Sequence, residues 1–163
     1  MSEVRKIAAI LVADVVGYSR LASADEDRTL SRLRALRSDL IDPAVAHHHG
    51  RVVKRTGDGL IAEFRSVVEA VRSAIAMQNG LIERNVGVAD DRRIDFRIGV
   101  HLGDVVEEAD GDLMGEGVNI AARLEGIAKP RRDLPFRGRL SASQRAARSH
   151  RQRSRPHPTQ EHH

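Results

Sequence analysis

The chain opens with an almost unbroken apolar run over residues 7–16, IAAILVADVV, which only Asp14 interrupts. A run of this kind is typical of a strand that is covered on both faces. Ser23 and Glu26 then resemble a capping box, and leucines recur after it at helical spacing. This pattern predicts a first helix, which Pro43 kinks or ends.

Two short apolar segments follow, RVVKRT and LIAEF, joined by Gly57-Asp58-Gly59. Glycine-flanked aspartate between two such segments is typical of a β-hairpin. Ser66 and Glu69 form a second capping-box pattern and predict a helix that continues to about residue 82.

Apolar and polar residues alternate from Ile94 to Leu102, which predicts a strand with one buried face. Val105 and Val106 fit the start of its hairpin partner, and VNIAARLEGIAK, residues 118–129, predicts a last short helix. The order of elements predicts an α/β sandwich of βαββαβ type, with a mostly antiparallel sheet and helices on one face.

Charge divides the chain near residue 130. Residues 131–163 contain nine arginines and two acids, a net charge of +7, so residues 1–130 carry −3 of the formal +4. The last segment also lacks apolar periodicity. We therefore expect a folded domain over residues 5–130 and a basic, disordered tail over 131–163.

Composition bears on location and partners. The chain has no cysteine, no apolar signal segment at its start, and no apolar run near the ~20 residues of a membrane helix. These features favour the cytoplasm and exclude a membrane partner. The basic tail offers only Phe136 for base stacking, so we expect no specific nucleic-acid binding.

Two carboxylates stand out chemically. Asp14 ends the apolar strand and Asp58 sits at the tip of the predicted hairpin. A carboxylate in a buried strand is costly unless it is paired or binds a metal ion, and two on adjacent strands suit a pair of Mg²⁺ ions. The alternative is that Asp14 caps a loop and Asp58 occupies an ordinary turn.

Four blocks in order carry a family resemblance: ADVVGYS, VVKRTGDG, RIGVHLGDV and DLMGEGVNIAARLE. Together they resemble the class III adenylate and guanylate cyclase catalytic domains over about Arg5 to Pro130. The resemblance implies the cyclase fold and the conversion of ATP to cyclic AMP and pyrophosphate. A GxxxxGK[ST] phosphate loop is absent, and a diguanylate cyclase or polymerase palm leaves the VNIAAR block unexplained.

The resemblance also implies residue roles. Asp14 and Asp58 match the ligands of two Mg²⁺ or Mn²⁺ ions, Asn119 matches the residue that orients the ribose, and Arg123 matches the one that stabilises charge on the reacting phosphate. Lys54 and Asp112 match the pair that selects the base. Backbone N–H groups of one turn are expected to contact the phosphates, namely those of Val15, Val16, Gly17, Tyr18 and Ser19.

Both sets of residues are present in one chain, so the resemblance implies a homodimer with two sites at its interface. For Arg123, the alternative is a solvated helix residue that pairs with Glu116 or Glu125. For Lys54, the alternative is a solvent-facing strand residue.

The family pattern breaks after Lys129-Pro130, where relatives continue with roughly GGICLS, a helix and a hairpin. We hypothesise a frameshift, because codons for RRDLPF can yield GGICLS when read one base later; sequencing the gene tests this. A domain without its final helix and hairpin is expected to bind ATP weakly. The alternative function is therefore a catalytically impaired module for nucleotide binding or dimerisation.

Overall fold

Strand β1 (Val4–Val15) lies at the centre of a five-stranded sheet, as its apolar sequence predicts. The computed structural model describes residues 3–130, and the strand order is β2-β3-β1-β4-β5 with every neighbouring pair antiparallel. The other strands are β2 (Arg51–Arg55), β3 (Gly59–Phe64), β4 (Phe96–Glu107) and β5 (Leu113–Met114).

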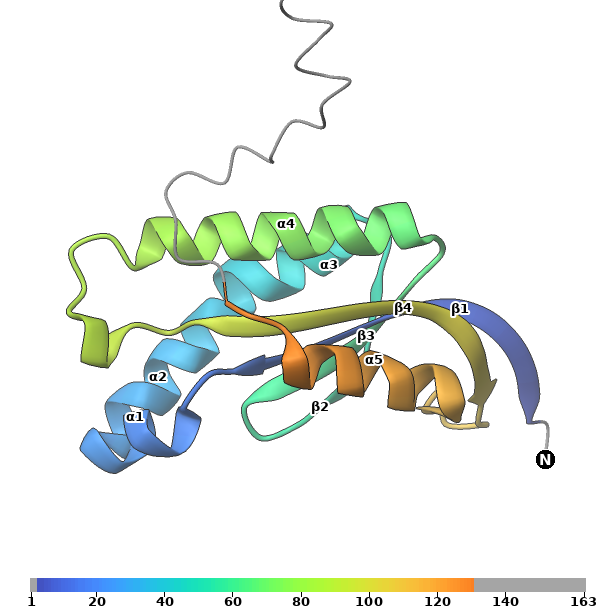
Figure 1. Ribbon diagram of the computed structural model, residues 1–163, viewed down its shortest axis with the longest axis horizontal. Helices are drawn as coiled ribbons and strands as arrows, with labels where there is room; N and C mark the ends of the chain where they lie inside the picture. Colours follow the sequence, from blue (N-terminus) through green and yellow to red (C-terminus); the bar gives the residue numbers. More distant parts are fainter. Residues whose placement is uncertain (1–2, 131–163) are drawn as a thin grey trace, which may run out of the picture.

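Helical segments connect these strands (Figure 1). Between β1 and β2 lie α1 (Tyr18–Ala24), α2 (Glu26–Leu36), the π-helix η1 (Arg37–Ile41) and α3 (Asp42–His47). Helix α4 (Val67–Arg84) and the 3₁₀ turn η2 (Asp90–Arg92) join β3 to β4, and α5 (Glu116–Ile127) follows β5. This confirms the predicted fold class and the order of its elements.

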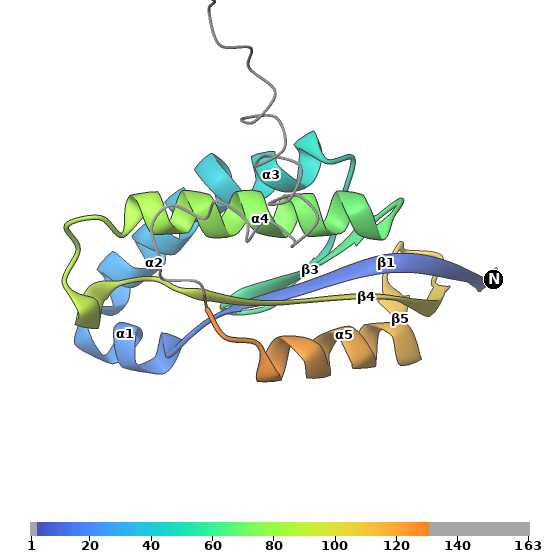
Figure 2. The same cartoon turned by 45° about the horizontal axis from the view of Figure 1, so that its top comes forward.

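The two faces of β1 belong to two different cores. Ala9, Leu11 and Ala13 pack in the larger core with residues of α2, α3 and α4, whereas Ala8 and Ile10 pack with Ala121 of α5. Figure 2 shows α3 and α4 on one side of the sheet and α5 on the other. The expectation of helices on one face only is therefore wrong, because a strand apolar on both sides needs cover on both.

The first helical region also differs from its prediction. Ser23 lies inside α1, where its hydroxyl donates to the Ser19 carbonyl, and Asp25 is the cap of α2, accepting from the Arg28 N–H at 3.0 Å. Pro43 lies in the first turn of α3, where its missing N–H costs nothing. The helical irregularity is the π-helix that precedes it.

The predicted start of α4 is confirmed, whereas the strand expected after β4 begins later than predicted. The Ser66 hydroxyl accepts from the Glu69 N–H at 3.2 Å and caps α4. Val105 and Val106, expected in a hairpin partner, instead belong to β4, which pairs with β1 over twelve residues. The partner is β5, opposite Val106 and Glu107.

The sheet curls so that its two edges approach each other. Arg51 on edge strand β2 donates from Nη1 to the Gly111 carbonyl at 3.0 Å, just before β5 on the far edge. Arg51 and Lys6 both pair with Glu63 at 2.7 Å and also with Glu107. This four-residue network crosses from β2 to β4.

None of the helices within residues 3–130 is long and apolar enough to span a membrane. The predicted basic tail and the expected loss of the final helix and hairpin lie outside the described residues.

Candidate active site

The two aspartates singled out in the sequence lie next to each other at one end of the sheet. Asp14 is the penultimate residue of β1 and stands opposite Gly59 in β3, and the Val15 N–H donates to the Asp58 carbonyl at 3.2 Å. Gly59 is required here, because a Cβ would collide with the Ala13 carbonyl and come within 3.0 Å of the Asp14 Cβ. The hairpin turn is thereby held against the end of β1.

A third acid and an arginine join this pair. Arg97 stands directly opposite Asp14 in β4, and its Nε and Nη2 each lie 3.4 Å from an oxygen of the Asp14 carboxylate. The same Nε is 3.4 Å from Oε1 of Glu125, which α5 brings to this face of the sheet. Arg97 also donates to the Gly126 carbonyl at 3.2 Å.

Glu125 is a buried carboxyl with a raised pKa. It is 7% exposed, and within the described residues its Oε1 has no hydrogen-bond partner. Burial, hydrogen bonding to Asp14 and the charge of Asp14 raise its pKa to about 7, with a smaller contribution from Asp58, against the opposing charge of Arg97. Arg97 thus pairs with two acids, Asp14 and Glu125, while the charge of Asp58 also acts on Glu125, so the site carries excess negative charge.

This charge suits a divalent cation. The part of the chain that the structure describes contains no group of three or more His, Cys, Asp or Glu side chains arranged to hold a metal ion alone. Mg²⁺ commonly needs only one or two protein carboxylates, with substrate phosphates and water completing its shell. Adjacent Asp14 and Asp58, beside a buried acid with an unsatisfied oxygen, fit that kind of site.

The turn after β1 is only partly free to bind phosphate. The Val15 N–H is bonded to Asp58, and the Val16 N–H donates to the Asp95 carbonyl at 2.8 Å, so these two groups are already used. The N–H groups of Gly17, Tyr18 and Ser19 have no acceptor within residues 3–130. Gly17 adopts a left-handed conformation, φ 65°, and begins α1. The phosphate contacts expected from the N–H groups of Val15 and Val16 would require these bonds to break, and those expected from Gly17, Tyr18 and Ser19 stay a prediction.

Lys54 and Asp112 come from opposite edges of the sheet. Lys54 is exposed on β2, where the register shifts by one residue, and Asp112 lies just before β5. The Asp112 carboxylate accepts from the Leu113 N–H at 2.8 Å. The bond from Arg51 to Gly111 connects the strand of Lys54 to the loop of Asp112.

Asn119 and Arg123 share an exposed face of α5, one turn apart. Neither side chain forms a hydrogen bond or ion pair with another residue of the described part, so the alternative pairing of Arg123 with Glu116 or Glu125 is not seen. Glu125 and Ala121 occupy the buried face instead. The chain therefore does not bring Asn119 and Arg123 to its own Asp14.

Arg97 and Glu125 were not among the predicted site residues. The sequence pattern predicts Arg97 only as a polar residue of an alternating strand, and Glu125 only as an alternative surface partner for Arg123. The sequence held one signal for Glu125, which lies four residues after Ala121 on the apolar stripe of the last helix.

Comparisons with known proteins bear on the family to which the chain belongs. Residues 2–133 match the family described as the adenylate and guanylate cyclase catalytic domain. The chain is 50% identical over 126 residues to putative adenylate cyclase 3 of Rhizobium meliloti (strain 1021), covering 77% of this chain and 21% of that protein. It is 30% identical over 135 residues to an adenylate cyclase of Anabaena cylindrica, covering 74% and 27%.

Among solved structures, the fold is similar to that of the adenylate/guanylate cyclase/hydrolase from Silicibacter pomeroyi. The TM-score is 0.73 at 43% identity, over 79% of this chain and 74% of that one. The chain spans about a fifth of the length of the Rhizobium protein. The matched range contains every residue of the site described above, and the chain belongs to the adenylate and guanylate cyclase catalytic domain family.

Proposed function

We propose that this domain converts ATP into 3′,5′-cyclic AMP and pyrophosphate and serves intracellular signalling. The observation that carries the proposal is that the β1–β3 register and the Val15–Asp58 backbone bond place Asp14 and Asp58 at neighbouring positions. The names of the Rhizobium and Anabaena relatives, both called adenylate cyclases, support the choice of ATP.

Asp14 and Asp58 would hold two divalent ions per site, Mg²⁺ or Mn²⁺. Such ions act as Lewis acids and neutralise charge on the triphosphate. Arg97 offsets part of the charge on Asp14 and Glu125 and keeps Asp14 in place when no ion is bound. The N–H groups of Gly17, Tyr18 and Ser19, which have no acceptor within residues 3–130, would donate to phosphate oxygens.

In the reaction, the ribose 3′-oxygen attacks the α-phosphorus in line. A 3′-oxygen–phosphorus bond forms, the bond from the α-phosphorus to pyrophosphate breaks, and the hydroxyl proton passes to solvent. Asn119 holds the ribose in the attacking orientation, and Arg123 donates to the oxygens on which charge increases. Catalysis by such groups consists mainly of positioning and electrostatic stabilisation.

Base selection rests on donors and acceptors. Lys54 donates to N1 of adenine, and the Asp112 carboxylate accepts from the 6-amino group. Guanine presents the opposite pattern, so both side chains would face a like group. An unmatched buried polar group costs about 1–3 kcal/mol, which is enough to favour ATP.

The active unit in this proposal is a homodimer. Asn119 and Arg123 project from the exposed side of α5 and form no hydrogen bond or ion pair with an acid of residues 3–130. They would act on a nucleotide bound by Asp14 and Asp58 of the partner subunit. Two-fold symmetry then gives two equivalent sites.

Mixing two inactive variants tests the shared site. Asp14→Ala and Arg123→Ala should each form no cyclic AMP with Mn²⁺ and ATP. An equimolar mixture should recover up to about a quarter of the wild-type rate, because half of the dimers are mixed and each has one intact site. An active wild type without recovery in the mixture contradicts the shared site. A wild type that dimerises and binds ATP without turnover supports the impaired module instead.

A further inference from the structure

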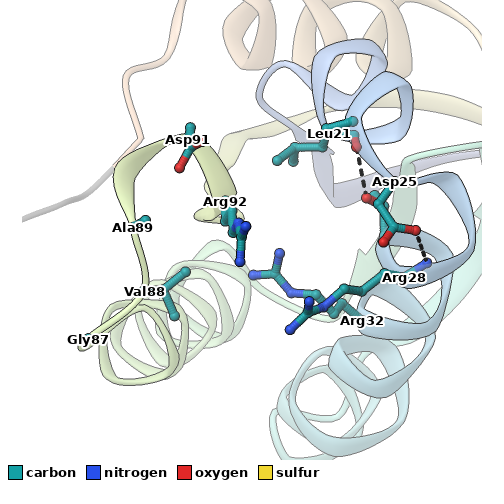
Figure 3. A pocket seen from close by; sticks show the side chains of 11 residues that line it. Leu21, Asp25, Arg28, Arg32, Gly87, Val88, Ala89, Asp91 and Arg92 are labelled. Carbon is teal, nitrogen blue, oxygen red and sulfur yellow. Dashed lines mark hydrogen bonds between the residues drawn. The ribbon is translucent and has the colours of Figure 1, made fainter.

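A separate cavity of about 510 Å³ lies between α2 and the segment that links α4 to β4. Arg28 and Arg32 line it from α2, one helical turn apart, and Arg92 lines it from η2 on the opposite side. Figure 3 shows the three guanidinium groups pointing toward one another across the cavity. None of these residues belongs to the site proposed for catalysis.

These arginines lack acidic partners. Within residues 3–130, no carboxylate lies within 4.0 Å of a guanidinium nitrogen of Arg28, Arg32 or Arg92. The neighbouring Arg93, by contrast, pairs with Asp90 at 3.2 Å and donates to the Val88 carbonyl. Two acids also line the cavity, Asp25 and Asp91, but neither forms an ion pair with these arginines within residues 3–130. The Asp25 carboxylate instead caps α2 by accepting from the Arg28 backbone N–H.

The cluster has an electrostatic cost in the free protein. Burial and the like charges of Arg28 and Arg92 lower the pKa of Arg32, and no acid opposes them. Arginine stays charged under ordinary conditions, so the repulsion persists until an anion enters. The protein therefore holds three mutually repelling charges around a space that has room for a ligand.

The walls indicate what kind of anion fits. Leu21, Val88 and Ala89 supply apolar surface beside the arginines, and Arg28 and Arg32 offer planar donors from one side while Arg92 faces them. Guanidinium groups bind phosphate oxygens through paired hydrogen bonds that match their planar donor geometry. The volume also exceeds that of a single phosphate ion.

We propose that this pocket binds the phosphate group of a small molecule, either an inorganic polyphosphate or a small organic phosphate ester. The inference is independent of the cyclase reaction, because it uses other residues and needs no metal ion. Leu21 belongs to α1, which begins at the turn proposed to contact the triphosphate, so an anion here would also contact that helix.

Calorimetric titration of the full chain in EDTA tests the pocket, with inorganic phosphate, pyrophosphate and ribose 5-phosphate as probes. Either pyrophosphate alone, or both pyrophosphate and ribose 5-phosphate, should bind more tightly than inorganic phosphate. Tight binding of pyrophosphate alone indicates an inorganic polyphosphate as the ligand. Tight binding of both probes indicates that organic phosphate esters are also accepted. Arg32→Gln should weaken binding about 10-fold or more, since a charge-assisted hydrogen bond contributes about 1.5–3 kcal/mol. Arg34→Gln is the matched control, because Arg34 is exposed on the same helix and lies outside the cavity.

Both variants keep the nine arginines of residues 131–163, so binding there would be equal in the two. Equal binding by wild type, Arg32→Gln and Arg34→Gln overturns the proposal, as does a wild type that binds none of the probes. Arg28→Gln serves as the second variant if Arg32→Gln does not fold.

Thermal unfolding supplies an independent readout. In phosphate-free buffer of low ionic strength, Arg32→Gln should melt at the same temperature as the wild type or higher, because one repelling charge is gone. Added pyrophosphate should stabilise the wild type more than the variant and reverse the order. A variant that melts well below the wild type without anion, and gains as much from pyrophosphate, contradicts the proposal.

Discussion

Arg97 and Asp14 stand opposite each other on β4 and β1, with two guanidinium nitrogens each 3.4 Å from a carboxylate oxygen. Because Arg97 also pairs with Glu125, it compensates two acids from different elements. Without a metal ion, Arg97 is the cation that pairs with the Asp14 carboxylate within residues 3–130.

Replacing Arg97 by glutamine should therefore destabilise the metal-free protein and strengthen its response to cations. Arg97 and Asp14 are only partly buried, so leaving the acid without its partner should cost about 1–3 kcal/mol. Mn²⁺ should raise the melting temperature of Arg97→Gln by more than it raises that of the wild type, because the added ion replaces the missing charge. Melting curves with EDTA and with Mn²⁺ measure both effects.

Arg93→Gln is the control for this experiment. Arg93 pairs with an exposed Asp90 and donates to the Val88 carbonyl, away from the acids of the site, so its loss should cost about 1–2 kcal/mol and leave the Mn²⁺ response unchanged. A smaller Mn²⁺ response in Arg97→Gln than in the wild type would show that Arg97 chiefly orients Asp14 for the ion.

Glu125 should make the metal-free domain less stable as pH rises. Its folded pKa of about 7 lies above the ordinary value of 4.5, so the folded state binds the proton more tightly than the unfolded state does. Between about pH 4.5 and 7 the free energy of unfolding therefore falls with increasing pH, by up to about 3 kcal/mol for this group. Urea unfolding in EDTA at several pH values measures this slope.

Glu125→Gln should remove that slope and leave the protein more stable than the wild type at pH 8, with little difference at pH 4. Glu116→Gln, exposed on the same helix, should keep the wild-type slope. If both variants show the same pH dependence as the wild type, Glu125 does not hold a raised pKa.

Glu63 should show the opposite pH dependence. Burial raises its pKa, but hydrogen bonds and charges from Lys6 and Arg51 outweigh that and hold the pKa below its usual range. Its stabilising contribution is therefore present above the unfolded pKa and is lost as pH falls through the folded one. Glu63→Gln should cost about 1–3 kcal/mol at pH 7, and the difference from wild type should shrink toward pH 3.

The same network holds the loop before Asp112, so Glu63→Gln should also increase amide hydrogen exchange at residues 108–112. Glu83→Gln on the exposed side of α4 is the control and should change neither the acid stability nor the exchange. If exchange became faster only in other loops, the ion network would not be what holds the loop before Asp112 in place.

The sequence predicted the order of elements well because most signals are local. The apolar run of β1, the Gly-flanked turn at Asp58 and the Ser66 cap each act within a few residues. The position of α5 is different, since it depends on which face of the sheet remains open. The run over residues 7–16 predicts cover on both faces of β1, and α5 supplies that cover on the second face.

The site was predicted in part for the same reason. Asp14 and Asp58 were recognised from local pattern and family resemblance, and the register of β1 with β3 brings them together. Arg97 and Glu125 join them only through the pairing of β4 and the packing of α5, which short-range periodicity does not specify. Likewise, the curl that connects Arg51 to Gly111 is a property of the whole sheet.

The close packing of α5 on β4 leads to a last prediction. A Cβ at Gly99 would collide with the Glu125 N–H and the Ala121 carbonyl, which are backbone atoms and cannot rotate away. Gly99→Ala should therefore push α5 from the sheet, cost about 3 kcal/mol, and move Glu125 away from Arg97. Denaturant unfolding measures the cost, and loss of the Glu125-dependent pH slope reports the displacement.

Gly126→Ala in α5 is the control, because a Cβ there meets no atom within 4 Å. It should instead stabilise the domain by about 0.5–1 kcal/mol through helix propensity. A Gly99→Ala protein that keeps both its stability and its pH slope would mean that α5 does not rest on β4 at this contact, and the placement of Glu125 beside Asp14 would fail with it.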